Sequence, residues 1–135
     1  MPAVEEQIDV AVPLAMAYGE WTRFEEYPRF MEDVAEVRQV DETHLHWRGT
    51  LDGVECEWVA EVTELRPEER IVWRARGGFA NAGVITFHPL DEATTRITMS
   101  ADVDEPDALA AIEERVKGDL QRFKEMVAPG SSTRG

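Results

Sequence analysis

The chain has 135 residues, 43% hydrophobic and 31% charged, which is long enough for one globular domain with a core and too short for two. Its net charge of −14 disfavours contact with nucleic acid or anionic lipid, so neither is expected as a partner. A single cysteine excludes an internal disulfide, no secretory signal is recognised, and no apolar run approaches the roughly 20 residues of a membrane helix. We therefore expect a cytoplasmic protein without stable membrane insertion. Residues 1–127 are expected to form one domain and residues 128–135 a disordered tail.

The first 31 residues predict one strand followed by two short helical segments. Residues 4–10 alternate apolar and polar side chains, as in a strand with one buried face. Pro13 suits the first position of a helix. One face of that helix carries Leu14, Ala17, Tyr18 and Trp21. A second helical turn or loop then brings toward the core Phe24, Tyr27, Phe30 and Met31.

From Val34 onward the alternation of apolar and polar residues predicts a meander of six strands. Their ranges are about 34–41, 44–51, 54–65, 70–76, 82–89 and 94–103. The dipeptide Asp52-Gly53 is typical of a two-residue type I′ hairpin turn, which needs positive φ at both central positions. Residues 66–69 suit a four-residue loop, and residues 77–80 and 91–93 separate the later strands.

The stretch HWRGTLDGVECEWV repeats its residue types in reverse around the Asp52-Gly53 turn. A two-residue turn pairs residues whose numbers sum to 105, so Trp47 opposes Trp58 on one face. The other face pairs Arg48 with Glu57 and His44 with Glu61, and it carries His46 as well. Across residues 66–69 the pairs sum to 135, which places Val62 opposite Trp73. In the last hairpin Ile85 and Phe87 point inward and His88 points outward, so all three histidines face away from the interior.

Residues 109–127 carry the only long helical pattern. Apolar side chains recur every three or four residues at Leu109, Ile112, Val116, Leu120, Phe123 and Val127. The opposite, polar side is assigned Glu113, Glu114, Arg115, Lys117, Arg122 and Lys124. Gly118 interrupts the helix at a cost of about 1 kcal/mol relative to alanine, either for close packing on the sheet or to leave room for a ligand. Together the elements predict an α+β fold with a curved seven-stranded antiparallel sheet around this helix and a cavity between them.

Several phrases resemble one branch of the START and birch-pollen-allergen-like (SRPBCC) superfamily. They are WTRFEEYPRFMEDV, LHWRG, ECEWVAEVTEL, RIVWRARGG, NAGVITFHPL and DLQRFKEMV. The branch contains polyketide cyclases and dehydrases and ubiquinone-binding proteins, and the resemblance covers about residues 4–127. It implies the helix-grip fold and a hydrophobic cavity between the sheet and the C-terminal helix. The ligand would be a small hydrophobic molecule, aromatic and polyketide- or quinone-like.

The interior positions of bulky side chains predict the walls of this cavity. The expected ligand-binding residues are Phe30, Trp47, Trp58, Trp73, Phe79, Phe87, Met99, Leu120 and Phe123. Two side chains could move protons in a cyclase or dehydrase reaction. Glu6 shares the inward parity of the first strand, and Tyr18 lies on the apolar face of the first helix, although it can equally be a core residue.

Other reactive side chains favour structural roles. His44 and His46 could share a metal with Glu61, but outward positions without further ligands favour an exposed strand, and no metal or cofactor is expected. Cys56 points inward and suits a small core residue better than a nucleophile. Two functions remain: a polyketide cyclase or dehydrase, and a carrier of lipids or quinones that catalyses nothing. The protein is expected to be a monomer or a homodimer.

Overall fold

The computed structural model describes residues 3–51, 53–76, 82–103, 107 and 109–128. Seven strands form one antiparallel sheet in the order β1-β7-β6-β5-β4-β3-β2. Their bounds are β1 (Ala3–Val10), β2 (Val34–Gln39), β3 (His44–Leu51), β4 (Val54–Arg66), β5 (Arg70–Arg76), β6 (Ala82–Asp91) and β7 (Thr94–Asp102). The helical elements are α1 (Leu14–Trp21), the 3-10 helix η1 (Phe24–Arg29) and α2 (Leu109–Val127).

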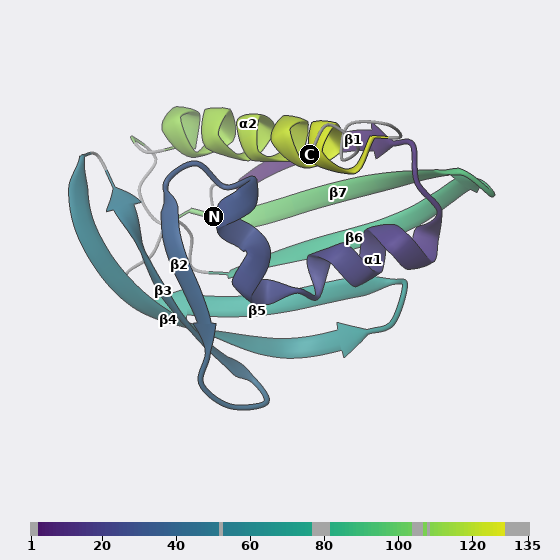
Figure 1. Ribbon diagram of the computed structural model, residues 1–135. Helices are drawn as coiled ribbons and strands as arrows, with labels where there is room; N and C mark the ends of the chain where they lie inside the picture. Colours follow the sequence, from purple (N-terminus) through teal and green to yellow (C-terminus); the bar gives the residue numbers. More distant parts are fainter. Residues whose placement is uncertain (1–2, 52, 77–81, 104–106, 108, 129–135) are drawn as a thin grey trace.

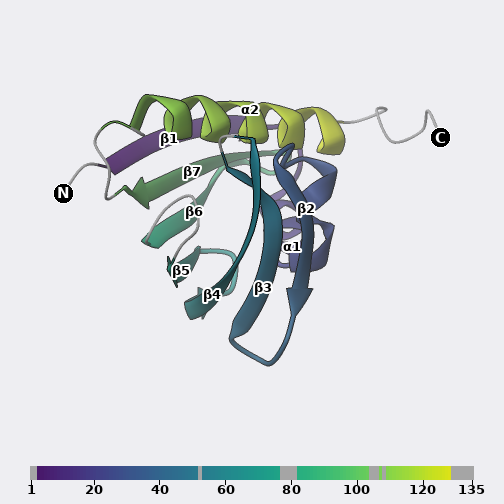
Figure 2. The same cartoon turned by 90° about the vertical axis from the view of Figure 1, so that its left-hand side faces the viewer.

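The sheet curls around its helices. Figure 1 shows α2 lying across the end of the sheet formed by β1 and β7, with α1 nearer β6. Figure 2 shows the sheet bending from β1 beneath α2 round to β2, so its concave side encloses the helical elements. The predicted helix-grip arrangement, with two short helices after the first strand, is confirmed. None of the helices in the described ranges is long and apolar enough to cross a membrane.

The predicted register of the central hairpin is confirmed. All eight pairs between β3 and β4 sum to 105, including Trp47 with Trp58. Gly53 has φ of 79°, as a type I′ turn requires at its second position, while Asp52 lies outside the described residues. The ion-pair partners on the outer face differ from the expected ones. Glu57 contacts His46 at 2.8 Å and Glu55 lies 3.9 Å from Arg48, because long side chains reach diagonally across strands. Arg48 also lies 3.5 Å from Glu36, the residue opposite it on β2.

The next hairpin departs from the predicted register at its closed end. Val62 pairs with Trp73 as expected, but Leu65 pairs with Ile71 because a β-bulge lies between Val62 and Glu64. The connection therefore has three residues, 67–69, instead of four. The Glu69 amide donates to the Arg66 carbonyl at 3.0 Å across this turn.

Alternation decides which side chains enter the core. In β6 and β7 the predicted inner residues are all buried: Gly83, Ile85, Phe87, Thr95, Ile97, Met99 and Ala101.

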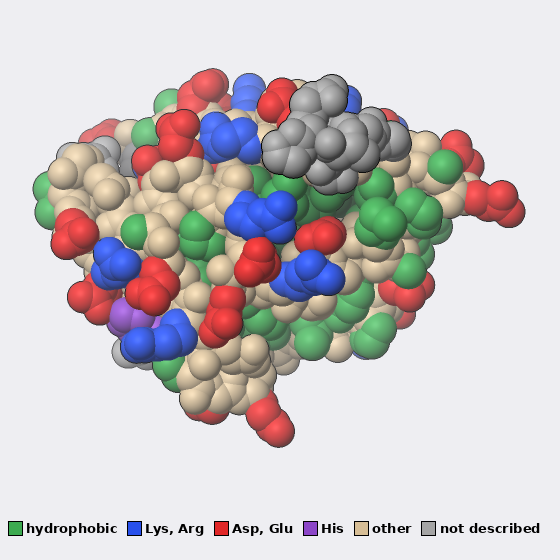
Figure 3. All heavy atoms as spheres, in the orientation of Figure 1, with side chains coloured by type: hydrophobic (Ala, Val, Ile, Leu, Met, Phe, Trp, Pro, Cys, Tyr) green, Lys and Arg blue, Asp and Glu red, His purple; other side chains and the backbone are tan. Residues whose placement is uncertain are grey.

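Pro13 proves to be the N-cap of α1 and not its first residue. The predicted tail, 128–135, lies outside the described residues apart from Ala128. On the face drawn in Figure 3, acidic and basic side chains are interspersed, and apolar side chains gather where α1 lies.

Candidate ligand-binding site

A cavity of about 110 Å³ lies between the concave face of the sheet and α2. Every strand except β1 contributes to its wall, together with α1, η1 and α2. The aromatic part of the wall consists of Trp21, Phe24, Tyr27, Trp47, Trp58 and Trp73. An apolar cavity of about 150 Å³ holds benzene, so this volume is on the scale of one small ring. A larger ligand therefore requires the wall to move.

Two tryptophans on neighbouring strands form one side of the cavity. The rings of Trp47 and Trp58 stack with centroids 5.8 Å apart and an interplanar angle of 16°, because the β3–β4 register places the residues opposite each other. Tyr27 approaches Trp47 with ring centroids 5.6 Å apart, linking η1 to this stack. Flat aromatic surfaces of this kind suit a planar apolar ligand.

The predicted ligand-binding residues divide into two groups. Trp47, Trp58, Trp73 and Met99 line the cavity. The other described ones, Phe30, Phe87, Leu120 and Phe123, are buried in the core and are not part of the wall. Phe30 and Phe123 have ring centroids 5.0 Å apart and fill space that the sequence pattern could not distinguish from the cavity. Phe79 lies outside the described residues.

Neither predicted proton-transfer residue lines the cavity. Tyr18 is half-buried with its ring edge-on to Phe87 at 5.4 Å, and its pKa is raised by burial and by the carboxylate of Glu68. Glu6 is half-buried on the edge strand β1, opposite Met99 in β7. Its inward parity holds, but β1 lies against α2 at the margin of the cavity instead of on its wall.

The wall contains two charged side chains that we did not expect there. Arg115 and Asp119 on α2 line the cavity together with Ile112 and Val116. Their spacing of three and four residues places them on the apolar face of the helix, so Arg115 was wrongly assigned to the polar side. The signal was the interval from Ile112 through Arg115 to Asp119, which matches the helical repeat as well as the apolar positions do.

Asp119 is a buried carboxyl group, 8% exposed. Burial raises its pKa to about 6, although Arg122, Arg115 and the backbone N–H of Glu32 act in the opposite direction. Arg122 donates to the Asp119 carboxylate at 2.5 Å. Asp119 can therefore change its charge near neutral pH, unlike an exposed aspartate.

Polar contacts hold α2 to the segment between η1 and β2. Arg115 binds the Asp33 carboxylate, with Nε 2.8 Å and Nη2 2.6 Å from Oδ2. Arg122 donates from Nε to the Phe30 carbonyl at 2.8 Å. A Cβ on Gly118 would lie 3.2 Å from the Arg122 guanidinium, so this glycine leaves room for that side chain. Neither of the roles weighed for Gly118, sheet packing or ligand space, describes this contact.

Hydrogen-bonding groups of three aromatic residues also matter for the wall. The Tyr27 hydroxyl donates to the Trp21 carbonyl at 2.6 Å, and burial raises the pKa of Tyr27, so this group serves the core. The indole N–H groups of Trp21 and Trp47 are buried and have no hydrogen-bond partner among the described residues. An unpaired buried donor costs free energy that a ligand acceptor can recover.

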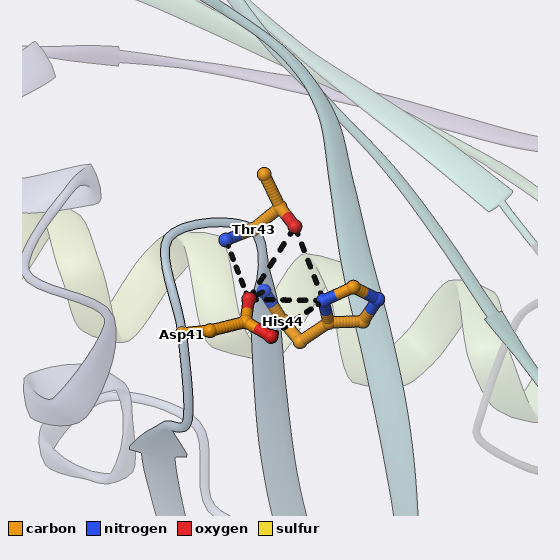
Figure 4. Close-up of polar contacts among 3 residues, drawn as sticks. All are labelled: Asp41, Thr43 and His44. Atoms are coloured by element: carbon orange, nitrogen blue, oxygen red, sulfur yellow. Dashed lines mark hydrogen bonds and ion pairs between the residues drawn. The ribbon is translucent and has the colours of Figure 1, made fainter.

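The histidines and the cysteine lie away from the wall. His44 Nδ1 contacts Asp41 Oδ1 at 2.9 Å, and the same oxygen accepts the Thr43 and His44 backbone N–H groups (Figure 4). These bonds close the β2–β3 turn and lower the pKa of Asp41 to about 2. Within the described ranges no group of three or more His, Cys, Asp or Glu side chains could hold a metal ion. Cys56 is half-buried and packs against the small cluster of Trp58, Ala60 and Ala75, as a core residue does.

Comparison with known proteins agrees with this architecture. A family model described as polyketide cyclase/dehydrase and lipid transport matches residues 10–125. The chain belongs to this family. One relative is an uncharacterized 17.2 kDa protein from the melC2-rnhH intergenic region of Streptomyces lincolnensis. It is 42% identical to this chain, and the match covers 94% of this chain and 90% of the relative.

Solved structures share the helix-grip fold of this polyketide cyclase/dehydrase and lipid transport family member. A START superfamily protein from Mycobacterium smegmatis has a TM-score of 0.75 at 12% identity, covering 98% of this chain and 99% of its own. The Zhui aromatase/cyclase from Streptomyces sp. R1128 has a TM-score of 0.66 at 15% identity, covering 90% of this chain and 85% of its own. At these identities the likeness concerns the fold alone.

Proposed function

We propose that the protein binds a small hydrophobic molecule, aromatic and polyketide- or quinone-like, in the cavity between the sheet and α2. The observation that carries the proposal is the wall itself, in which six aromatic side chains surround an unfilled volume. Membership of the polyketide cyclase/dehydrase and lipid transport family supports it. Burying an apolar ring against such a wall is favourable by about 25 cal/mol for each Å² removed from water.

Blocking the cavity tests the binding proposal. Ala75 lines the cavity and is 7% exposed, so Ala75→Leu fills part of the volume without removing any polar group. Ala110 is exposed on α2, and Ala110→Leu is the matched control. We expect saturable binding of toluene by calorimetry, weakened at least about tenfold by Ala75→Leu and unchanged by Ala110→Leu. Equal affinity in both variants would place the binding elsewhere, and thermal unfolding would verify that each variant folds.

A cyclase or dehydrase would act on its ligand in the same cavity. A structural likeness to an aromatase/cyclase supports this function at the level of the fold. Such chemistry needs a proton donor or acceptor in contact with the reacting atoms. The wall offers Asp119, whose pKa lies near 6, as a titratable group for that purpose.

A carrier that leaves its ligand unchanged is the second candidate. It is favoured by the positions of Glu6 and Tyr18, neither of which lines the cavity. Addition of the purified protein to a polyketide-forming system separates the two functions. An altered product distribution that Asp119→Asn, Glu6→Gln or Tyr18→Phe abolishes would support catalysis. Recovery of an unmodified ligand from the protein, with products unaffected, would support the carrier.

A further inference from the structure

The charged part of the cavity wall has a defined hydrogen-bonding capacity. The ionised carboxylate of Asp119 can only accept hydrogen bonds, at about four lone-pair positions. In the part of the chain that the structure describes, the Arg122 guanidinium and the backbone N–H of Glu32 donate to it. Capacity for a further donor therefore remains on a carboxylate that is 8% exposed and forms part of an otherwise apolar wall.

The neighbours of Asp119 limit what that further donor can be. Arg115 lines the same wall but is bound to Asp33, and Arg122 is held by the Phe30 carbonyl and faces Glu32. Both arginines therefore already have carboxylate or carbonyl partners in residues 30–33. A cationic ligand would add charge beside two guanidinium groups, so a neutral hydroxyl is the donor that best fits this position.

The indole groups give an independent indication that the ligand is not a pure hydrocarbon. Trp21 is fully buried, Trp47 is half-buried, and both line the cavity. Their Nε1–H groups are buried and have no acceptor among the described residues. Native proteins satisfy the great majority of such donors, so an oxygen acceptor supplied by a ligand would complete the wall.

We infer that the ligand of this cavity is an aromatic molecule that carries a hydroxyl group, and that this hydroxyl donates a hydrogen bond to the Asp119 carboxylate. The inference rests on the proposed function and narrows it. A quinone without hydroxyl groups has only acceptors, and it would place a carbonyl oxygen against an acceptor-only carboxylate. A phenol or an enolised ketone supplies the missing donor and also offers its own oxygen to an indole N–H.

Three single-ring probes test this inference on the intact chain. Toluene has no hydrogen-bonding group, anisole has an acceptor only, and phenol has both a donor and an acceptor. The affinities are measured by calorimetry at pH 7.5 for the wild type and for Asp119→Leu, which removes the acceptor and keeps similar bulk. Glu114→Gln removes a carboxylate from an exposed position on the same helix and serves as the control.

We expect Asp119→Leu to lower the affinity for phenol at least about tenfold. The affinities for toluene and anisole should stay within about twofold of the wild-type values or increase. Glu114→Gln should change none of the three. Equal effects of Asp119→Leu on all probes, or no effect on phenol, would overturn the inference while leaving the proposed function in place. Failure of every probe to bind the wild type would instead contradict the proposed function.

A second variant covers the case in which Asp119→Leu does not fold. Asp119→Asn retains the shape and one neutral acceptor, and neutral acceptors form weaker hydrogen bonds than a carboxylate. We expect it to lower the affinity for phenol by a smaller factor than Asp119→Leu does, and to leave the affinity for toluene unchanged. Unchanged phenol affinity in this variant would also count against the inference.

Discussion

The indole of Trp73 lies directly over Gly83 on the adjacent strand. The two residues are opposite each other in the β5–β6 register, and a Cβ on Gly83 would stand 2.1 Å from both Cζ2 and Cη2 of Trp73. No real Cβ contact is that short, so any side chain at position 83 must displace the ring. Gly83 therefore determines where one aromatic wall of the cavity lies.

Gly83→Ala is expected to move Trp73 and to change both stability and ligand binding. Overpacking of a core typically costs about 1–3 kcal/mol, and we expect a loss of that size in the free energy of unfolding. Chemical denaturation with tryptophan fluorescence measures it. Gly19→Ala is the control, because a Cβ there meets nothing within 4 Å and the residue lies in α1. It should be neutral or stabilising by up to about 1 kcal/mol. Equal effects of the two substitutions would contradict the role of Gly83.

Glu68→Gly is expected to stabilise the protein. Glu68 has φ of 61°, the left-handed conformation, in the turn closed by the bond from the Glu69 amide to the Arg66 carbonyl. Relief of that conformation in a residue other than glycine is worth about 1 kcal/mol. Glu68→Ala removes the same charge but keeps the strained backbone, so it should bring no comparable gain in thermal unfolding. A gain from alanine alone would point to charge instead of conformation.

The raised pKa of Asp119 predicts that the stability contributed by this residue decreases as the pH rises. Its pKa in the folded protein is about 6, above the ordinary value of 3.8, so the folded state holds this proton more tightly than the unfolded state does. The contribution of Asp119 is therefore most favourable below about pH 4 and is lost as the pH rises through 6. At one pKa unit per about 1.4 kcal/mol, the loss is on the order of 3 kcal/mol.

Asp119→Asn removes that dependence. The free energy of unfolding of the variant minus that of the wild type should increase between pH 4 and pH 7, measured by urea denaturation at each pH. The charged groups around the site, namely Arg115, Arg122, Asp33 and Glu32, are the same in both proteins and largely cancel in the difference. A difference that stays constant over this range would show that Asp119 titrates like an exposed aspartate.

Gly118→Ala tests the contact between Gly118 and Arg122. Alanine in a helix interior normally stabilises by about 1 kcal/mol over glycine. Here its Cβ would lie 3.2 Å from the Arg122 guanidinium, which Asp119 and the Phe30 carbonyl hold in place. We expect the usual gain to be absent in thermal unfolding. The full gain would mean that Arg122 moves aside without loss.

Alternation and turn chemistry made most of the sheet predictable from the sequence. The Asp52-Gly53 turn fixed the β3–β4 register, since a slip of one residue would have exposed Trp47 and Trp58. The bulge beyond Val62 was not predictable, because nothing in the local residue types distinguishes a four-residue loop from a shorter loop with a bulge. Pairing of β1 with β7 brings together strands that are far apart in the sequence, and no local residue pattern indicates it.

The cavity wall was predictable in part. Strand parity identified Trp47, Trp58 and Trp73 as inward-facing, but parity alone does not separate a residue that fills the core from one that borders empty space. Phe30, Phe87, Leu120 and Phe123 were therefore placed on the wall although they pack within the core. Asp119 was not among the predicted wall residues, although its spacing of three residues from Val116 places it on the inner side of the helix.

The central claim, that an apolar cavity between the sheet and α2 accepts small hydrophobic molecules, is tested most directly by a crystal structure under xenon pressure. Xenon enters dry apolar cavities of this size without needing a specific polar partner. We expect a xenon atom between Trp58, Met99 and Ile112 in the wild type, with reduced occupancy in Ala75→Leu. Crystals that take up xenon elsewhere but leave this volume filled by protein side chains or ordered water would contradict it.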